Sequence, residues 1–204
     1  MHERAELVAP SLRHARSYVA ALREGFRRGA QDRVSERRIS QIEADFARYI
    51  AAITDQSGSI RLPTGEIAPK VPFSVFWLVE GDEFIGETHV RHQLNDYLVK
   101  EGGHVGYGIR PARRRQGYGK LILELALEEC RRLGLRRALV TCLEDNMASA
   151  RIIEANGGEL ENVIADPAGR GPLRRYWIAL QARAAARKGP GEAPRQPGGR
   201  SPIQ

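Results

Sequence analysis

The amino-acid sequence predicts a single α/β domain of the α+β type, with a mixed sheet and flanking helices. Three observations predict it. Two stretches of helical apolar spacing open the chain, several strand-like runs follow, and the rest alternates strand, helix, strand, helix and strand. The chain has 204 residues, 42% of them hydrophobic, which is enough for one substantial core. We therefore expect one domain over residues 1–180.

The first two helices are predicted from apolar residues that recur every three or four positions. Within residues 10–28 they are Leu12, Ala15, Val19, Leu22 and Phe26. Within residues 39–53 they are Ile39, Ile42, Phe46, Tyr49, Ile50 and Ile53. Each stretch should form one amphipathic helix. Residues 57–72 are rich in Gly, Pro and Ser, so we expect a long loop there.

The next segment predicts a β-hairpin. Residues 73–93 contain two β-rich runs joined at Gly81-Asp82, a sequence typical of a tight turn. Residues 102–110, GGHVGYGIR, predict another short strand. Its Gly106 and Gly108 indicate either a bulge or a close approach to the backbone, because glycine weakens a regular strand.

The second half of the chain predicts alternating elements. Residues 119–133 carry a wide apolar face and end before Gly134, which suits a helix C-terminus. A buried strand is expected over 136–143 and a short helix over 146–156. The run ELENVIA over 159–165, a polar loop and a final strand over 174–180 complete the domain.

Composition excludes several classes of protein. Cys130 and Cys142 have no CxxC spacing and no nearby histidine pair, so we expect buried free thiols and no metal site. No apolar run approaches the roughly 20 residues of a membrane-spanning helix, and residues 1–19 lack the apolar core of a signal peptide. We therefore expect a cytoplasmic protein with no membrane partner.

The formal net charge of +7 does not indicate a nucleic-acid partner. Residues 181–204 are rich in Pro, Gly and Arg, and they contribute +4 of that charge. Because such a composition cannot form a core, we expect a disordered basic tail. The remaining +3 over residues 1–180 is ordinary for a globular domain, so we do not expect nucleic acid as a partner.

The stretch RRRQGYGK over residues 113–120 lies between a predicted strand and a predicted helix. The first turn of a helix has unsatisfied N–H groups and the positive end of the dipole, so this turn should bind phosphate oxygens. A Walker loop is excluded by Arg114 and Leu121, and a dinucleotide-binding GxGxxG motif is excluded by Ile122. What remains is R-x-x-G-x-G, formed by Arg114, Gly117 and Gly119.

With this motif the sequence resembles the GNAT superfamily of acyl-CoA-dependent N-acetyltransferases, whose hallmark is Q/R-x-x-G-x-G/A at a strand-to-helix junction. A downstream pattern of that family is matched by Asn146, Ser149 and Gly157 in NMASARIIEANGG. The resemblance covers roughly residues 75–180. It implies a mostly antiparallel twisted sheet that is splayed at the acyl-CoA site, with acetyl-CoA as co-substrate. It also implies that the pantetheine arm pairs with a bulged strand, here residues 102–110.

The resemblance implies a set of cofactor-binding residues in and around the turn. They are Ile109, Arg114, Arg115, Gln116, Gly117, Tyr118, Gly119, Lys120, Asn146 and Ser149. For Arg113 and Arg115 two roles are equally open, either a ligand for the CoA 3′-phosphate or a solvated charge. The tyrosine with which the family often protonates the departing thiolate is replaced by Ile153. Either Tyr176 or Tyr107 serves instead, or solvent protonates the thiolate.

Candidate catalytic and acceptor-binding residues lie on the neighbouring strands. Glu87 and His104 are the two candidates for the base that deprotonates the amine, each with a structural role as the alternative. Arg91 and Asn95 should lie near the acceptor, where the arginine could bind a substrate carboxylate, or be plain surface residues.

The resemblance therefore implies transfer of an acetyl group from acetyl-CoA to a primary amine of a small molecule or peptide, by direct attack. The alternatives are an acyl-CoA-binding regulatory module without turnover, and a nucleic-acid-associated protein that uses its basic tail. The identity of the acceptor and the formation of a homodimer are left open.

Overall fold

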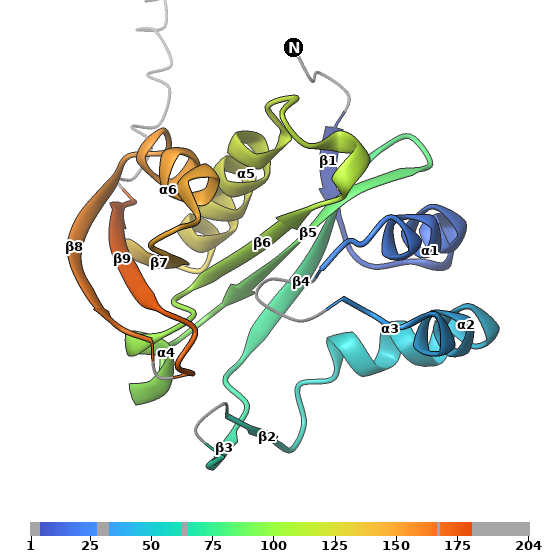
Figure 1. The fold of residues 1–204 in the computed structure, drawn as a ribbon, viewed down its shortest axis with the longest axis horizontal. Coiled ribbons are helices and arrows are strands. Elements are labelled where there is room, and N and C mark those ends of the chain that lie inside the picture. Colours follow the sequence, from blue (N-terminus) through green and yellow to red (C-terminus); the bar gives the residue numbers. More distant parts are fainter. Residues whose placement is uncertain (1–4, 28–32, 63–64, 167, 181–204) are drawn as a thin grey trace, which may run out of the picture.

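The structure is a computed structural model that describes residues 5–27, 33–62, 65–166 and 168–180. The predicted tail over residues 181–204 lies outside this part of the chain, so it stays a prediction. The described residues form an α/β fold in which antiparallel sheet is flanked by helices, which confirms the predicted fold class (Figure 1).

The N-terminal part differs from the prediction in two places. The described chain begins with a strand, β1 (Ala5–Val8), which precedes a 3-10 turn and α1 (Ala15–Arg23). The second predicted helix is divided into α2 (Glu36–Ala44) and α3 (Phe46–Thr54). The break lies at Asp45, whose backbone is not helical and whose side chain accepts a hydrogen bond from the Arg48 N–H at 3.0 Å, capping α3.

The predicted loop over residues 57–72 also contains regular structure. β2 (Ser59–Arg61) pairs antiparallel with β3 (Ile67–Pro69) in a small separate hairpin. The hairpin predicted next is confirmed, with β4 (Phe73–Glu80) joined to β5 (Glu83–Arg91) at Gly81-Asp82.

The second half largely follows the sequence pattern. A short helix that the pattern did not predict, α4 (Asp96–Lys100), precedes β6 (Val105–Ile109) and a 3-10 turn over Pro111–Arg113. The remaining elements are α5 (Tyr118–Arg132), β7 (Arg137–Leu143), α6 (Met147–Glu154), β8 (Gly158–Ala165) and β9 (Pro172–Ala179).

The large strands form two antiparallel sheets that diverge between β6 and β7. One sheet has the order β1-β4-β5-β6 and the other β7-β9-β8. At the point of divergence the backbone N–H of His104 donates to the Leu139 carbonyl at 2.7 Å. β6 ends one sheet and β7 begins the other, and the two sheets lie at an angle to each other, which confirms the predicted splay (Figure 1).

Helices cover the two faces of the β1-β4-β5-β6 sheet with separate apolar clusters. On one face, α1, α2 and α3 pack on Trp77, Val79 and Phe84, and Trp77 stacks on Tyr18 with 4.7 Å between ring centroids. On the other face, α5 packs through buried residues such as Ile122. Burying a side chain of that size contributes about 1.5–3 kcal/mol.

The glycines of β6 do not form the expected bulge. The β5–β6 register runs from Gly86↔Ile109 to Val90↔Val105 without a shift, and the irregularity lies instead between β4 and β5, at Leu78/Val79. A Cβ on Gly108 would lie 2.8 Å from the Arg27 carbonyl oxygen, so glycine is needed there for close approach of the chain.

Candidate functional site

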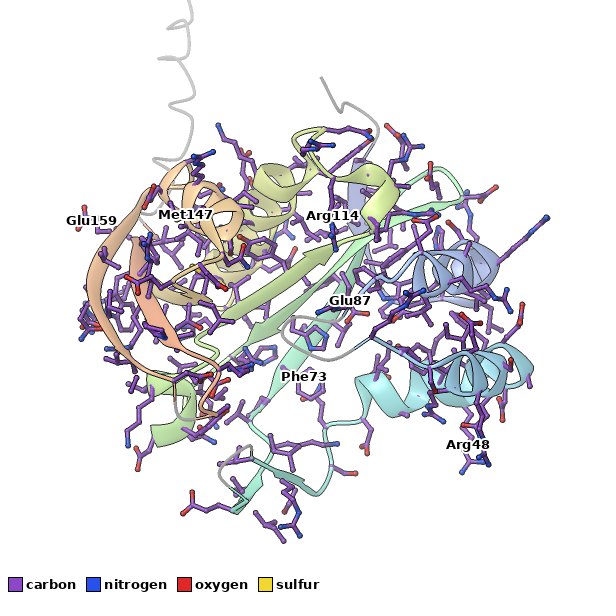
Figure 2. All side chains as sticks on the ribbon, in the orientation of Figure 1. Arg48, Phe73, Glu87, Arg114, Met147 and Glu159 are labelled. Atoms are coloured by element: carbon purple, nitrogen blue, oxygen red, sulfur yellow. The ribbon has the colours of Figure 1, made fainter. Side chains whose placement is uncertain are left out.

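A cavity of about 570 Å³ lies where the two sheets diverge. Its walls come from β5, α4, β6, β7, the start of α6 and the start of β9. The residues with polar or ionisable side chains that line it are Glu87, His89, Arg91, Tyr97, Glu101, Tyr107, Thr141, Cys142, Asn146, Ser149 and Arg170. In Figure 2, Glu87 lies near the centre of the molecule, between Arg114 above it and Phe73 below it.

Three chemically active side chains follow one another along β5. Because side chains alternate across a strand, Glu87, His89 and Arg91 point to the same face of the sheet. The register places Glu87 beside Trp77 on β4 and beside Gly108 on β6. It places His89 beside Gly106, where a Cβ would meet no atom within 4 Å. The strand therefore borders open space at His89, whereas beside Glu87 the Gly108 position is closely approached by the Arg27 backbone.

Glu87 and His89 form a pair at the inner end of the row. The His89 imidazole and the Glu87 carboxylate are joined by a hydrogen bond of 2.7 Å between Nε2 and Oε1. The Trp77 indole N–H donates to the other oxygen of Glu87 at 2.9 Å. The Glu87 side chain is 2% exposed and that of His89 is 27% exposed. His89 is therefore the more accessible member of the pair, and the sequence analysis did not predict it.

The cavity is also lined by Tyr107 on β6 and Ser149 on α6, whose hydroxyl groups are 2.9 Å apart. Burial raises the pKa of Tyr107 above its usual range, so its hydroxyl stays protonated. Asn146 caps α6, where its side chain accepts a hydrogen bond from the Ser149 N–H at 3.1 Å. Two of the predicted cofactor-binding residues, Asn146 and Ser149, thus line the cavity.

The glycine turn lies at the start of α5, as predicted. Gly117 precedes the first helical residue with a left-handed backbone, φ +88°, and Gly119 packs against Ile152. Arg115 also has a positive φ and is exposed. The backbone N–H groups of the first turn of α5 are therefore exposed to solvent, because the glycines have no side chains to cover them.

The other side chains around this turn differ in what they contact. Arg113 pairs with Glu83, and the Arg114 Nε donates to the carbonyl of Ile109 at 3.2 Å. The Tyr118 side chain is buried and its hydroxyl donates to Glu80 at 3.0 Å, so only its backbone faces the turn.

For Gln116 and Lys120, the structure neither supports nor contradicts the predicted cofactor-binding role. The side-chain amide of Gln116 donates to the Ala112 carbonyl at 3.2 Å, and the Lys120 side chain is exposed.

Three predicted catalytic or acceptor-binding residues are not among those that line the cavity. His104 Nδ1 accepts a hydrogen bond from the Leu139 N–H at 2.9 Å, which ties β6 to β7. Tyr176 lies in the core, where its hydroxyl donates to Glu154 at 3.1 Å. The Asn95 side chain caps α4 by accepting a hydrogen bond from the Leu98 N–H. This geometry gives each of them a structural contact, and their predicted functional roles have no further support.

His104 carries a testable effect on stability. Burial, together with the charges of Arg91 and Arg137, lowers its pKa to about 4 from the ordinary 6.5. Between these values the unfolded chain binds a proton that the folded chain does not, so stability falls as the pH drops below about 6.5. Between about pH 7 and about pH 5, we expect the free energy of unfolding to fall by about 2 kcal/mol more in the parent than in His104→Asn. Urea unfolding at the two pH values measures it. Equal losses would contradict the assigned neutral, buried role.

The structure thus combines a glycine turn at the start of a helix with a cavity between two diverging sheets. The family description "Acetyltransferase (GNAT) domain" matches residues 5–159. The chain therefore belongs to the GNAT acetyltransferase family and is an acyl-CoA-dependent N-acetyltransferase. A search of the curated proteins found no match.

Solved structures share this fold at low sequence identity. yncA from Salmonella typhimurium, with its cofactor acetyl-CoA, is 15% identical over 89% of this chain and 97% of its own, with a TM-score of 0.52. The Salmonella typhimurium acetyltransferase that modifies the N-terminal serine of ribosomal protein L7/L12 is 15% identical over 87% and 96%, with a TM-score of 0.59. A mutant spermidine/spermine N-acetyltransferase, SpeG from Vibrio cholerae, is 13% identical over 87% and 95%, with a TM-score of 0.55.

The residues present fit acetyl-CoA, which is the co-substrate of this family. The exposed start of α5 suits a pyrophosphate, and the open space at Gly106 beside the free edge of β6 suits an extended arm. Within the described ranges no cluster of three or more His, Cys, Asp or Glu residues could hold a metal ion. No helix in that part of the chain is long and apolar enough to cross a membrane.

Proposed function

We propose that the protein transfers the acetyl group of acetyl-CoA to a primary amine by direct attack, and that the Glu87–His89 pair receives the proton of the amine. The observation that carries the proposal is a buried carboxylate held by Trp77 and His89 at the wall of a cavity between the diverging sheets. A base must lie within hydrogen-bond or one-water reach of its proton, and this pair borders the space where an amine can enter.

The hydrogen bond to Glu87 assigns a role to each nitrogen of His89. In the neutral imidazole, Nε2 carries the proton that is donated to Glu87, so Nδ1 is the nitrogen that can accept another. Glu87 then stabilises the imidazolium that forms. Trp77 fixes the carboxylate through the indole N–H, which makes Glu87 and Trp77 positioning residues and His89 the base.

The reaction then balances without a further reactant. The substrate ammonium gives a proton to His89, and the neutral nitrogen bonds to the thioester carbonyl carbon. The carbon–sulfur bond breaks, and CoA leaves as a thiol after its sulfur takes up a proton. The second proton that the nitrogen loses replaces the proton taken up by the sulfur, so the only net proton released is the one received by His89. Tyr107 is the donor that the cavity offers to the thiolate, because its hydroxyl stays protonated and borders the same space.

The oxyanion that develops during attack needs hydrogen-bond donors. β6 is an edge strand on the side facing β7, and in an antiparallel pair only alternate residues turn their N–H groups toward the neighbouring strand. The other N–H groups of β6 face the opening between the sheets. Such preorganised donors stabilise the tetrahedral intermediate, and holding both reactants in one cavity supplies a further large part of the acceleration.

A thiol-release assay tests the proposed activity. The full chain is incubated with acetyl-CoA and with amines of different classes, including amino acids, polyamines, aminoglycosides and peptides with free N-termini. We expect free CoA thiol in amounts equal to the acetylated amine for at least one class, because the cavity holds a base beside the acyl site. Calorimetry with acetyl-CoA is run in parallel. Binding of acetyl-CoA without thiol release across all classes would contradict the proposal and favour a regulatory module without turnover.

A further inference from the structure

We propose that the acceptor is a small amino-carboxylic acid, and that Arg91 binds its carboxylate while the Glu87–His89 pair receives the proton of its amine. The inference concerns the acceptor class and rests on the proposed acetyl transfer for its catalytic half. The carboxylate site itself rests on Arg91 and its surroundings.

In the part of the chain that the structure describes, only one of the three guanidinium nitrogens of Arg91 is hydrogen-bonded to the protein. Its Nη1 donates to the carbonyl groups of Gly102 and Gly103, at 3.2 and 3.0 Å. Within residues 5–27, 33–62, 65–166 and 168–180, Nε and Nη2 make no hydrogen bond, and no carboxylate lies within 4.0 Å of the group. A side-chain nitrogen without a partner is either exposed or fully buried. In the same part of the chain, the only fully buried one without a partner is Nε1 of Trp177, so the two Arg91 nitrogens are not fully buried. Nε and Nη2 of Arg91 are therefore accessible, and the space they border is the cavity that this residue lines.

The other charged groups of the cavity already have partners. Arg170 is shared between Glu101 and Asp166, with 2.6 Å from its Nε to Asp166 Oδ2. Glu101 also accepts a hydrogen bond from the Tyr97 hydroxyl. Burial lowers the pKa of Arg91, which shows that its charge is partly desolvated, although an arginine keeps its proton. A partly desolvated cation gains most from an anionic ligand, and the planar guanidinium matches a carboxylate.

The spacing along β5 sets the distance between the two ends of the acceptor. Side chains two residues apart on one face of a strand are about 6.6 Å apart, so Arg91 lies one such step from His89. The contacts with Gly102 and Gly103 hold the Arg91 guanidinium at the end of β5 away from His89. An acceptor with its amine at His89 and its carboxylate at Arg91 must therefore span at least one such step, which a short amino-carboxylic acid can do with a hydrogen bond at each end.

The charge of the cavity argues against polyamines and aminoglycosides as acceptors. Their sites need an excess of carboxylates to compensate several ammonium groups. Here the carboxylates of Glu87 and Glu101 are offset by Arg91 and Arg170, and a second ammonium would meet Arg91. Like charges in a partly desolvated site repel strongly, so such an acceptor is disfavoured.

Matched pairs of acceptors test the inference on the parent protein. Thiol release is measured for the proteinogenic amino acids, β-alanine and 4-aminobutanoate, each beside its own carboxamide, and for spermidine. We expect the best amino acid to have a KM about tenfold lower than its carboxamide, because only the carboxylate pairs with Arg91. In Arg91→Met this preference disappears, because methionine cannot pair with a carboxylate. The matched control is Arg48→Met, an exposed arginine on α3 far from Glu87 (Figure 2), which should keep the preference.

A binding measurement separates this inference from the proposed activity. Calorimetry with the same pairs in the presence of CoA reports carboxylate recognition without turnover. One possible outcome is that no amine is acetylated, although the amino acids bind more tightly than their carboxamides and lose this advantage in Arg91→Met. The proposed activity would then be wrong, and the carboxylate site would be supported. Equal KM values and equal affinities for both members of every pair in the parent protein would overturn the inference. This last comparison needs no variant, so it decides the matter even if Arg91→Met does not fold.

Discussion

His89→Gln is expected to lower kcat/KM by about 100-fold or more, because a positioned general base contributes roughly 10²- to 10⁴-fold to a proton transfer. Glutamine can still donate a hydrogen bond to Glu87, yet it cannot accept a proton. The 2.7 Å contact with Glu87 can therefore be kept while the chemistry is lost. The measurement is kcat/KM against pH with the best acceptor of the thiol-release assay. We expect the pH profile of this variant to differ from that of the parent, because the proposed base is absent.

The effect has to be separated from general damage to the sheet. His92→Gln is the matched control, because the His92 Nε2 is hydrogen-bonded to the Ser74 hydroxyl at 2.9 Å and His92 does not line the cavity. It should keep the parental rate and profile. Glu87→Gln keeps the shape of the carboxylate but cannot stabilise an imidazolium, so we expect a loss in kcat with little change in the KM for acetyl-CoA. Parental rates and an unaltered profile in His89→Gln would remove His89 from the mechanism.

The strand that carries this pair shows how far sequence reasoning could reach. Glu87 was predicted as a base because it lies on a strand beside the expected cleft, and it does line the cavity. His89 was missed, although the alternation of a strand places residues 87 and 89 on one face. The two-residue spacing between Glu87 and His89 could therefore have indicated the pair. What the sequence could not show is the cross-strand position of Trp77, which holds Glu87 and leaves His89 as the accessible member.

The predictions for His104 and Tyr176 failed to gain support for a related reason. Tyr176 lies on β9 and His104 directly precedes β6, and a strand has two faces and two edges that the sequence does not label. His104 sits just before β6, where the diverging sheets come together, and its ring accepts a hydrogen bond from the Leu139 N–H on β7. That place depends on pairing between segments 35 residues apart, which local patterns do not encode.

Some short helices and strands could not be predicted from local sequence patterns either. β1 forms because Ala5–Val8 pairs with β4, starting at Ala5↔Glu80, and nothing within those four residues requires a strand. The break at Asp45 was in principle readable, since aspartate is a preferred helix N-cap. In contrast, α5 and the turn before it follow directly from a long apolar period and two glycines, which is why that part of the fold was predicted correctly.

That turn gives the second large effect. Gly117→Asp is expected to weaken acetyl-CoA binding by about 100-fold, because a carboxylate at the first turn of α5 would repel the pyrophosphate at close range. The matched variant is Gly117→Asn, which has nearly the same size. Aspartate and asparagine both tolerate the left-handed backbone that Gly117 adopts at φ +88°, and both can cap a helix. The two variants therefore differ in charge, and strain or capping should affect them alike.

Calorimetric titration with acetyl-CoA at low and high salt distinguishes the possible outcomes. Gly117→Asn should lose affinity only modestly, and the gap between the two variants should narrow as salt screens the repulsion at this exposed position. Equal affinities for Gly117→Asp and Gly117→Asn at low salt would show that the pyrophosphate is not held at this turn. The phosphates would then have to be bound elsewhere, and the exposed cations around the turn, such as Arg115 and Lys120, would be solvated charges without a ligand.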